Sequence, residues 1–100
     1  MAIRHTVMIK LAKKEDKTKV AESLEKMAGG LSGVKWINFS VFTDLGLVET
    51  NADVTVVIDF PDKDNYLAYA SHPDHLSIVN SNKPLVVNRL AIQYDAPAKM

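Results

Sequence analysis

Apolar and polar residues alternate along four segments of the chain, which is the pattern of β-strands with a buried face. These segments are residues 2–11, 34–43, 52–60 and 85–94. In the first of them His5 stands in a row that is otherwise aliphatic, so its ring is expected to face the core or a cavity. A buried imidazole needs a polar partner. Either a backbone carbonyl or a functional site would supply one.

Two other segments have the 3.6-residue period of amphipathic helices. Residues 15–28 carry an apolar stripe, and Gly29 and Gly30 are expected to end this helix with left-handed backbone angles. Residues 63–70 form a short helix, and a further turn or two is expected from Pro73, because proline suits the first position of a helix. The order β-α-β-β-α-β is typical of a ferredoxin-like α+β sandwich with helices on one face of the sheet.

Several strands are apolar on both rows, which predicts that both faces of the sheet are covered. Helices would cover one face and a second copy of the chain the other, so we expect a homodimer through the face that carries Arg4, Thr6 and Met8. A length of 100 residues with 47% hydrophobic content suits a single domain over residues 1–100. The tail from about residue 96 is expected to be loose.

Charge and composition narrow the choice of partner. Twelve basic and twelve acidic residues cancel and no basic-aromatic cluster occurs, which argues against nucleic acid. No apolar run approaches the roughly 18 residues of a membrane helix. The chain has no cysteine, and its start lacks the apolar core of a signal peptide, so we expect a cytoplasmic protein without disulfides. The expected partner is a small molecule or another protein chain.

The stretch from Tyr69 to His75 is the strongest candidate for chemistry, because it holds two of the three histidines around Pro73. A helix that starts at Pro73 places His75 near free backbone N–H groups and the positive end of the dipole, which disfavours a protonated ring. A neutral His75 could act as a general base while Tyr69 donates to a developing enolate oxygen and His5 orients a ring or the substrate. The alternative is a structural hydrogen-bond cluster between helix and sheet.

A metal site is the third hypothesis for the same residues. His5, His72, Asp74 and His75 are all competent ligands. Zinc usually takes three or four converging protein ligands, and the His-Pro-Asp-His spacing matches no familiar zinc pattern. We expect neither a metal nor another cofactor.

Several stretches together resemble the stress-responsive dimeric α/β-barrel (Dabb) domain family. They are Ile3-Arg-His-Thr-Val-Met-Ile-Lys-Leu11, Gly33-Val34, Asp53-Val-Thr-Val-Val-Ile-Asp-Phe60, Tyr69-x-x-His72-Pro73-x-His75, and Arg89 to Tyr94-Asp95. The resemblance covers almost the whole chain and implies a homodimer in which two four-stranded sheets pack into a barrel. The family includes plant stress-related proteins, bacterial members of unknown role and a plant polyketide cyclase, olivetolic acid cyclase. That enzyme closes a linear poly-β-keto thioester by an intramolecular aldol condensation.

The resemblance also implies roles for individual residues. In the cyclase a histidine matching His75 is the base, a tyrosine matching Tyr69 assists it, and a histidine matching His5 lies nearby. This chain has Val54 where the cyclase has a further pocket histidine. The residues expected to line a ligand pocket around the three are His72, Val54, Val7 and Trp36.

Two functions therefore stay open. One is the binding of a small apolar or carbonyl ligand such as a β-dicarbonyl compound, with or without cofactor-free cyclase or lyase chemistry. The other is a stress-related structural homodimer without catalysis. A cavity on the order of a few hundred cubic ångströms between sheet and helices would favour a ligand, and a filled interior would favour a structural role.

Overall fold

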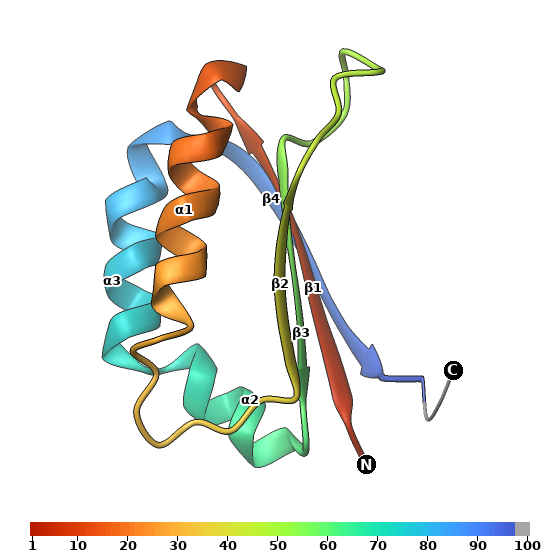
Figure 1. Cartoon of the computed structure of the whole chain (residues 1–100), viewed down its shortest axis with the longest axis vertical. Coiled ribbons are helices and arrows are strands. Elements are labelled where there is room, and N and C mark those ends of the chain that lie inside the picture. The colour runs from red at the N-terminus through yellow and green to blue at the C-terminus, as the bar shows by residue number, and fades with distance from the viewer. Residues whose placement is uncertain (98–100) are drawn as a thin grey trace.

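A four-stranded antiparallel sheet with helices on one face makes up the fold (Figure 1). The computed structural model describes residues 1–97. It confirms the predicted ferredoxin-like α+β arrangement, including the predicted break between a helix that ends at residue 70 and one that begins at Pro73. The elements are β1 (Ile3–Leu11), the 3-10 helix η1 (Lys14–Asp16), α1 (Lys17–Met27), β2 (Asn38–Thr43), β3 (Val54–Phe60), α2 (Lys63–Ala70), α3 (Pro73–Asn82), the 3-10 helix η2 (Lys83–Leu85) and β4 (Val86–Asp95).

The strands are ordered β2-β3-β1-β4, so β1 lies in the middle and β4 forms an edge. His5 in β1 is opposite Ile58 of β3 and Gln93 of β4. Directly opposed residues of antiparallel strands point to the same face of the sheet. The register therefore assigns every strand residue either to the face under the helices or to the outer face.

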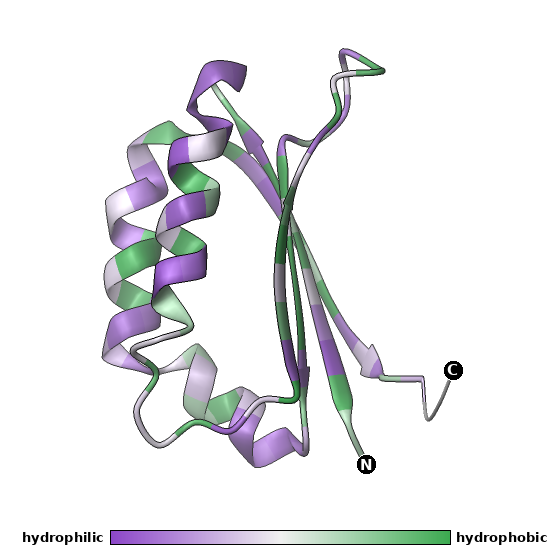
Figure 2. Ribbon diagram, in the orientation of Figure 1, coloured by the Kyte–Doolittle hydropathy of each residue, from purple (hydrophilic) through white to green (hydrophobic). Residues whose placement is uncertain are grey.

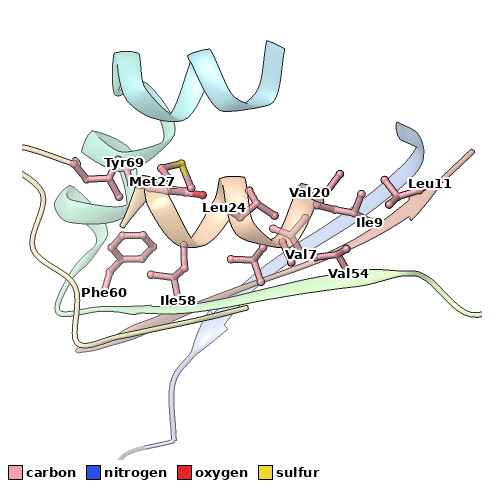
Figure 3. Close-up of a cluster of buried hydrophobic side chains, with 13 residues drawn as sticks. Val7, Ile9, Leu11, Val20, Leu24, Met27, Val54, Ile58, Phe60 and Tyr69 are labelled. Atoms are coloured by element: carbon pink, nitrogen blue, oxygen red, sulfur yellow. The ribbon is translucent and has the colours of Figure 1, made fainter. Parts of the chain in front are cut away.

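The core lies between the sheet and α1 (Figure 3). The predicted alternation of β1 and β3 is confirmed, since every second residue of each strand is buried beneath the helices. Figure 2 shows the same division, with green positions on the strands and on the turns of α1 that face them. Burying each such side chain is worth about 1.5–3 kcal/mol. The buried apolar residues are Val7, Ile9, Leu11, Val20, Ala21, Leu24, Met27, Leu31, Val54, Val56, Ile58, Phe60 and Tyr69.

The second strand is shorter than predicted, because β2 begins only at Asn38 rather than at residue 34. The backbone N–H of Lys35 donates to the side-chain oxygen of Asn65 in α2, 2.8 Å away. This bond directs the segment toward α2 instead of along β3. Trp36 consequently lies in a loop, with its ring 5.6 Å from that of Phe39.

The prediction of left-handed angles at Gly29 and Gly30 is wrong. Among residues 1–97 the glycines with positive φ are Gly33 and Gly46. A Cβ atom at Gly30 would lie 2.8 Å from Oδ2 of Asp74 at the start of α3, a contact that the half-exposed Asp74 side chain can relieve by moving.

The outer face of the sheet carries large apolar side chains that nothing in residues 1–97 covers. Met8 of β1 lies beside Leu90 of β4, and both are about half exposed or more. Phe42 and Ile92 are exposed on the same face. In addition, no helix within the described part of the chain is long and apolar enough to cross a membrane.

Candidate functional site

The structure brings three of the predicted residues together from separate elements. The His5 ring centroid lies 5.7 Å from that of Tyr69, which in turn lies 4.3 Å from that of His75. His5 comes from β1, Tyr69 from the last turn of α2 and His75 from the first turn of α3. We call this group the His5–Tyr69–His75 cluster.

Aromatic packing on the sheet positions the tyrosine of the cluster (Figure 3). Phe60, at the end of β3, is fully buried, and its ring lies 5.2 Å from that of Tyr69. The ring of Tyr66, one turn earlier in α2, lies 5.3 Å from His5 and 5.8 Å from Phe60. These contacts fix α2 against the sheet and fill the space beside His5.

His72 separates the two helices and acts as the cap of α3. Pro73 is the first residue of that helix, and the Nδ1 atom of His72 accepts a hydrogen bond from the Asp74 N–H at 3.0 Å. Its Nε2 lies 2.9 Å from the carbonyl oxygen of Ser32, so Nε2 carries the proton. Both ring nitrogens are therefore occupied by backbone groups, and the geometry gives His72 a capping role.

His5 is held as a neutral imidazole. It is 3% exposed, and the side-chain N–H of Gln93 donates to its Nδ1 atom at 2.9 Å. An imidazole that accepts at Nδ1 carries its proton at Nε2. Burial lowers the pKa of His5 to about 4, and the nearby charges of Arg89 and His75 add to this effect. His5 thus offers an N–H donor at neutral pH.

His75 has the opposite tautomer. Its Nδ1 lies 3.0 Å from the carbonyl oxygen of Ala70, and because a carbonyl can only accept, Nδ1 carries the proton. Burial lowers the pKa of His75, with the Ala70 hydrogen bond opposing and Arg89 and His72 adding to the shift. At neutral pH the Nε2 atom is therefore an unprotonated base.

Tyr69 completes the set as a donor. It is 4% exposed, and burial raises the pKa of its phenol while the charge of Arg89 acts in the opposite direction. The hydroxyl stays protonated at neutral pH. The cluster therefore contains one base, His75 Nε2, and two neutral donors, Tyr69 O–H and His5 Nε2–H.

None of these three atoms has a hydrogen-bond partner within residues 1–97. Within residues 1–97 every fully enclosed side-chain nitrogen or oxygen has a hydrogen-bond partner. The recorded bonds of His5 and His75 use only their Nδ1 atoms, and the Tyr69 hydroxyl takes part in no hydrogen bond of the described chain. These atoms are therefore not completely enclosed, although His5 and Tyr69 are only 3% and 4% exposed.

Two further residues act on the cluster, and the sequence alone did not indicate either of them. Gln93 fixes the His5 tautomer, and Arg89 acts electrostatically on all three members of the cluster. Both belong to the edge strand β4. Only the strand register, which the sequence pattern does not give, places them beside β1.

The other residues predicted to line a pocket lie away from the reactive atoms or make no recorded contact with them. Val54 is opposite Ile9, four positions along β3 from Ile58, the partner of His5. At roughly 3.3 Å per residue this is a separation of about 13 Å. Val7 lies two positions from His5 on the same face and is buried. Trp36 contacts Phe39 in the loop before β2.

The hollows described on the surface lie elsewhere. The two on or beside the outer face, of about 390 and 230 Å³, are both lined in part by Met8 and Ala52, and the smaller one also by Arg89 and Leu90. None of the four described hollows in residues 1–97 is lined by His5, Tyr69 or His75. Nor do any three His, Cys, Asp or Glu side chains in this part of the chain converge as metal ligands would.

The fold belongs to the ferredoxin-like class, with helices on one face of the sheet and exposed apolar side chains on the outer face. Residues 3–96 match the family model of the stress responsive A/B barrel domain, Dabb. The chain therefore belongs to the Dabb family. No curated protein matches it in sequence.

Solved structures with the same fold include proteins from several bacteria. A dimeric ferredoxin-like protein of unknown function from Thermobifida fusca is 30% identical, with a TM-score of 0.80 over 96% of this chain and 92% of that one. A Dabb family protein from Mesorhizobium loti is 24% identical, with a TM-score of 0.72 over 97% and 98%. A proposed antibiotic biosynthesis monooxygenase from Deinococcus radiodurans is 16% identical, with a TM-score of 0.73 over 100% and 96%.

Proposed function

We propose that the protein binds a small carbonyl compound at the His5–Tyr69–His75 cluster and that Nε2 of His75 removes a proton beside the carbonyl. The pair of opposite tautomers carries this proposal. His75 presents a lone pair and His5 presents an N–H, and each tautomer is set by a hydrogen bond to the other ring nitrogen. The Nε2 atoms of both rings are thereby left without a partner in the described part of the chain.

The reaction is cofactor-free. The C–H bond between two carbonyls breaks, its proton moves to Nε2 of His75, and its electron pair moves onto a carbonyl oxygen to form an enolate. Tyr69 O–H and His5 Nε2–H donate hydrogen bonds to that oxygen. The enolate carbon then attacks a second carbonyl of the same molecule, and the new alkoxide takes a proton from the His75 imidazolium. The result is an aldol-type ring closure of the polyketide cyclase kind.

The second candidate is a structural homodimer without turnover. One observation favours it: Phe60, Tyr66 and Tyr69 pack around His5, and none of the described hollows lies at the cluster. In this case the cluster would only tie α2 and α3 to the sheet. The two candidates differ in whether His75 Nε2 ever takes a proton from a ligand.

We further infer that the functional unit is a homodimer formed through the outer face of the sheet. That face carries Met8, Phe42, Leu90 and Ile92, and exposed apolar patches of this kind mark association sites. The same face also carries an ion pair, in which the Arg4 guanidinium donates two hydrogen bonds of 2.8 and 2.9 Å to the buried carboxylate of Asp59. The dimeric state of the Thermobifida fusca protein supports this inference.

Deuterium incorporation tests the catalytic proposal. The protein is incubated in D₂O with a panel of β-keto thioesters and aryl β-diketones, and exchange between the carbonyls is followed by NMR. General base catalysis is typically worth 10²- to 10⁴-fold, so wild type should accelerate exchange of at least one compound by about 100-fold. His75→Asn keeps an amide N–H toward the Ala70 carbonyl but has no Nε2, and it should lose this acceleration.

His72→Asn is the matched control, because asparagine is a good N-cap residue and His72 contributes no free nitrogen. Its exchange rate should equal that of wild type. Equal rates in wild type and His75→Asn would refute the catalytic proposal. A dimer that neither binds nor exchanges any compound of the panel would favour the structural candidate.

A further inference from the structure

We propose that Arg89 is a specificity residue that binds a carboxylate of the ligand, so that the ligand of the His5–Tyr69–His75 cluster is an anionic carbonyl compound. This inference rests on the proposed binding function and names its substrate class. It does not require that the bound compound is turned over.

The register places the Arg89 side chain on the same side of the sheet as the cluster. Arg89 is opposite Ile9, which is buried beneath the helices, so both side chains point to that face. Gln93 lies in the same row of β4 and hydrogen-bonds to His5. Arg89 and Gln93 therefore project from one row of the edge strand, four positions or about 13 Å apart along it, so the long Arg89 side chain reaches the cluster only by extending along this row.

This row is open to solvent. Arg89, Ala91 and Gln93 are exposed, although their neighbours in β1, Ile9, Val7 and His5, are buried. The helices thus cover β1 and leave the helix-side row of β4 uncovered.

Electrostatics agree with the geometry. The positive charge of Arg89 lowers the pKa of His5 and of His75 and favours the ionised form of Tyr69. No carboxylate contributes to the pKa shift of any of the three groups. The cluster therefore consists of neutral groups with one cation beside them.

That cation has no carboxylate partner within residues 1–97. The ion pairs there join Arg4 to Asp59 and Lys14 to Asp53, and neither includes Arg89. A guanidinium matches a carboxylate with two parallel hydrogen bonds. The site thus has positive charge, two donors and a base, which suits a ligand with both a carboxylate and a carbonyl.

The test compares 4-oxo-4-phenylbutanoate with its neutral amide, which has the same aryl ketone. Binding to the full-length protein is measured by ¹H–¹⁵N NMR titration, with the amides of Ala91, Gln93 and His75 as reporters. Charged hydrogen bonds are worth about 1.5–3 kcal/mol, or roughly 10- to 100-fold in affinity. The carboxylate should bind at least tenfold more tightly than the amide and should shift these reporters.

Arg89→Gln should abolish the preference for the carboxylate, and Arg89→Lys should keep part of it. Lys19→Gln on α1 removes one exposed positive charge elsewhere and should leave the preference unchanged. Equal binding of the two compounds, no shift at the reporters, or a preference that survives in Arg89→Gln would overturn the proposal. Tighter binding of phenyl phosphate than of the carboxylate would also overturn it.

The outcome is separable from that of the catalytic proposal. Deuterium exchange of neutral β-diketones by wild type, together with equal binding of acid and amide, would refute the role of Arg89 alone. A retained carboxylate preference without any exchange would refute the role of His75 as a base and leave Arg89 as a binding residue.

Discussion

The rings of Tyr69 and His75 lie 4.3 Å apart although Tyr69 belongs to α2 and His75 to α3. The break between these helices creates the contact, since Ser71 ends α2 and Pro73 begins α3 with His72 as its cap. In a continuous helix residues six apart would lie on different faces, because one turn takes 3.6 residues. The helix break is therefore what assembles the candidate site.

His5 and His75 should make the stability of the protein depend on pH. The folded pKa of His5 is about 4 against an ordinary value of 6.5, and that of His75 is also lowered. The unfolded chain binds protons first as the pH falls below 6.5, so the free energy of unfolding should decrease through that range. Between pH 7.5 and 5 the His5 contribution is on the order of 2 kcal/mol.

Urea unfolding at several pH values measures this effect. The slope between pH 5 and 7 should become smaller in His5→Gln and, by a separate amount, in His75→Asn. A slope unchanged in both variants would contradict the burial of neutral imidazoles. The aspartates with lowered pKa, such as Asp53 and Asp59, titrate below this window.

His72→Ala should destabilise the protein without affecting proton exchange at His75. Loss of an N-cap costs about 0.5–2 kcal/mol, and this variant also loses the bond to the Ser32 carbonyl. His72→Asp should recover the cap but not the Ser32 contact. Thermal or urea unfolding gives the stability, and a His72→Ala protein of full stability but poor ligand binding would assign His72 to the ligand instead.

Tyr69→Phe should reduce exchange by on the order of 100-fold, as expected for the loss of one donor to an oxyanion. Its stability should change little, because the Tyr69 hydroxyl makes no hydrogen bond within the described part of the chain. Tyr66→Phe is the matched control, since Tyr66 also packs on His5 and Phe60. Equal loss of exchange in both variants would show that ring packing, not the Tyr69 donor, matters.

Leu90→Asp should convert the dimer into a monomer. Leu90 is 65% exposed and lies opposite Met8 on the outer face, so a carboxylate there would be buried unpaired in a dimer. Light scattering after size-exclusion chromatography measures the mass. Leu76→Asp, on the exposed side of α3, should stay dimeric, whereas a monomeric wild type at micromolar concentration would refute the interface.

The strands could be predicted because apolar and polar residues alternate along them, and the apolar row is the buried one. Val7 and Ile9 in β1, and Val54 and Ile58 in β3, occupy the buried row that the pattern assigned to them. The start of β2 could not be predicted. Its position depends on the bond between Lys35 and Asn65, two residues that are 30 positions apart.

The cluster itself was predictable only in part. Proline at position 73 indicated a helix start, and His5 stood out in an aliphatic row, so both could be chosen from the sequence. Arg89 and Gln93 gave no such signal, since their position beside His5 depends on the pairing of β1 with β4. The tautomers likewise depend on distant or irregular contacts, such as that of His75 with the Ala70 carbonyl.

The most direct test of the central claim is the tautomeric state of the two imidazoles, measured by long-range ¹H–¹⁵N NMR at pH 7. We expect His75 to have a protonated Nδ1 and an unprotonated Nε2, and His5 to have a protonated Nε2 and an unprotonated Nδ1. A doubly protonated His75, or a His75 with its proton on Nε2, would remove the base and contradict the account.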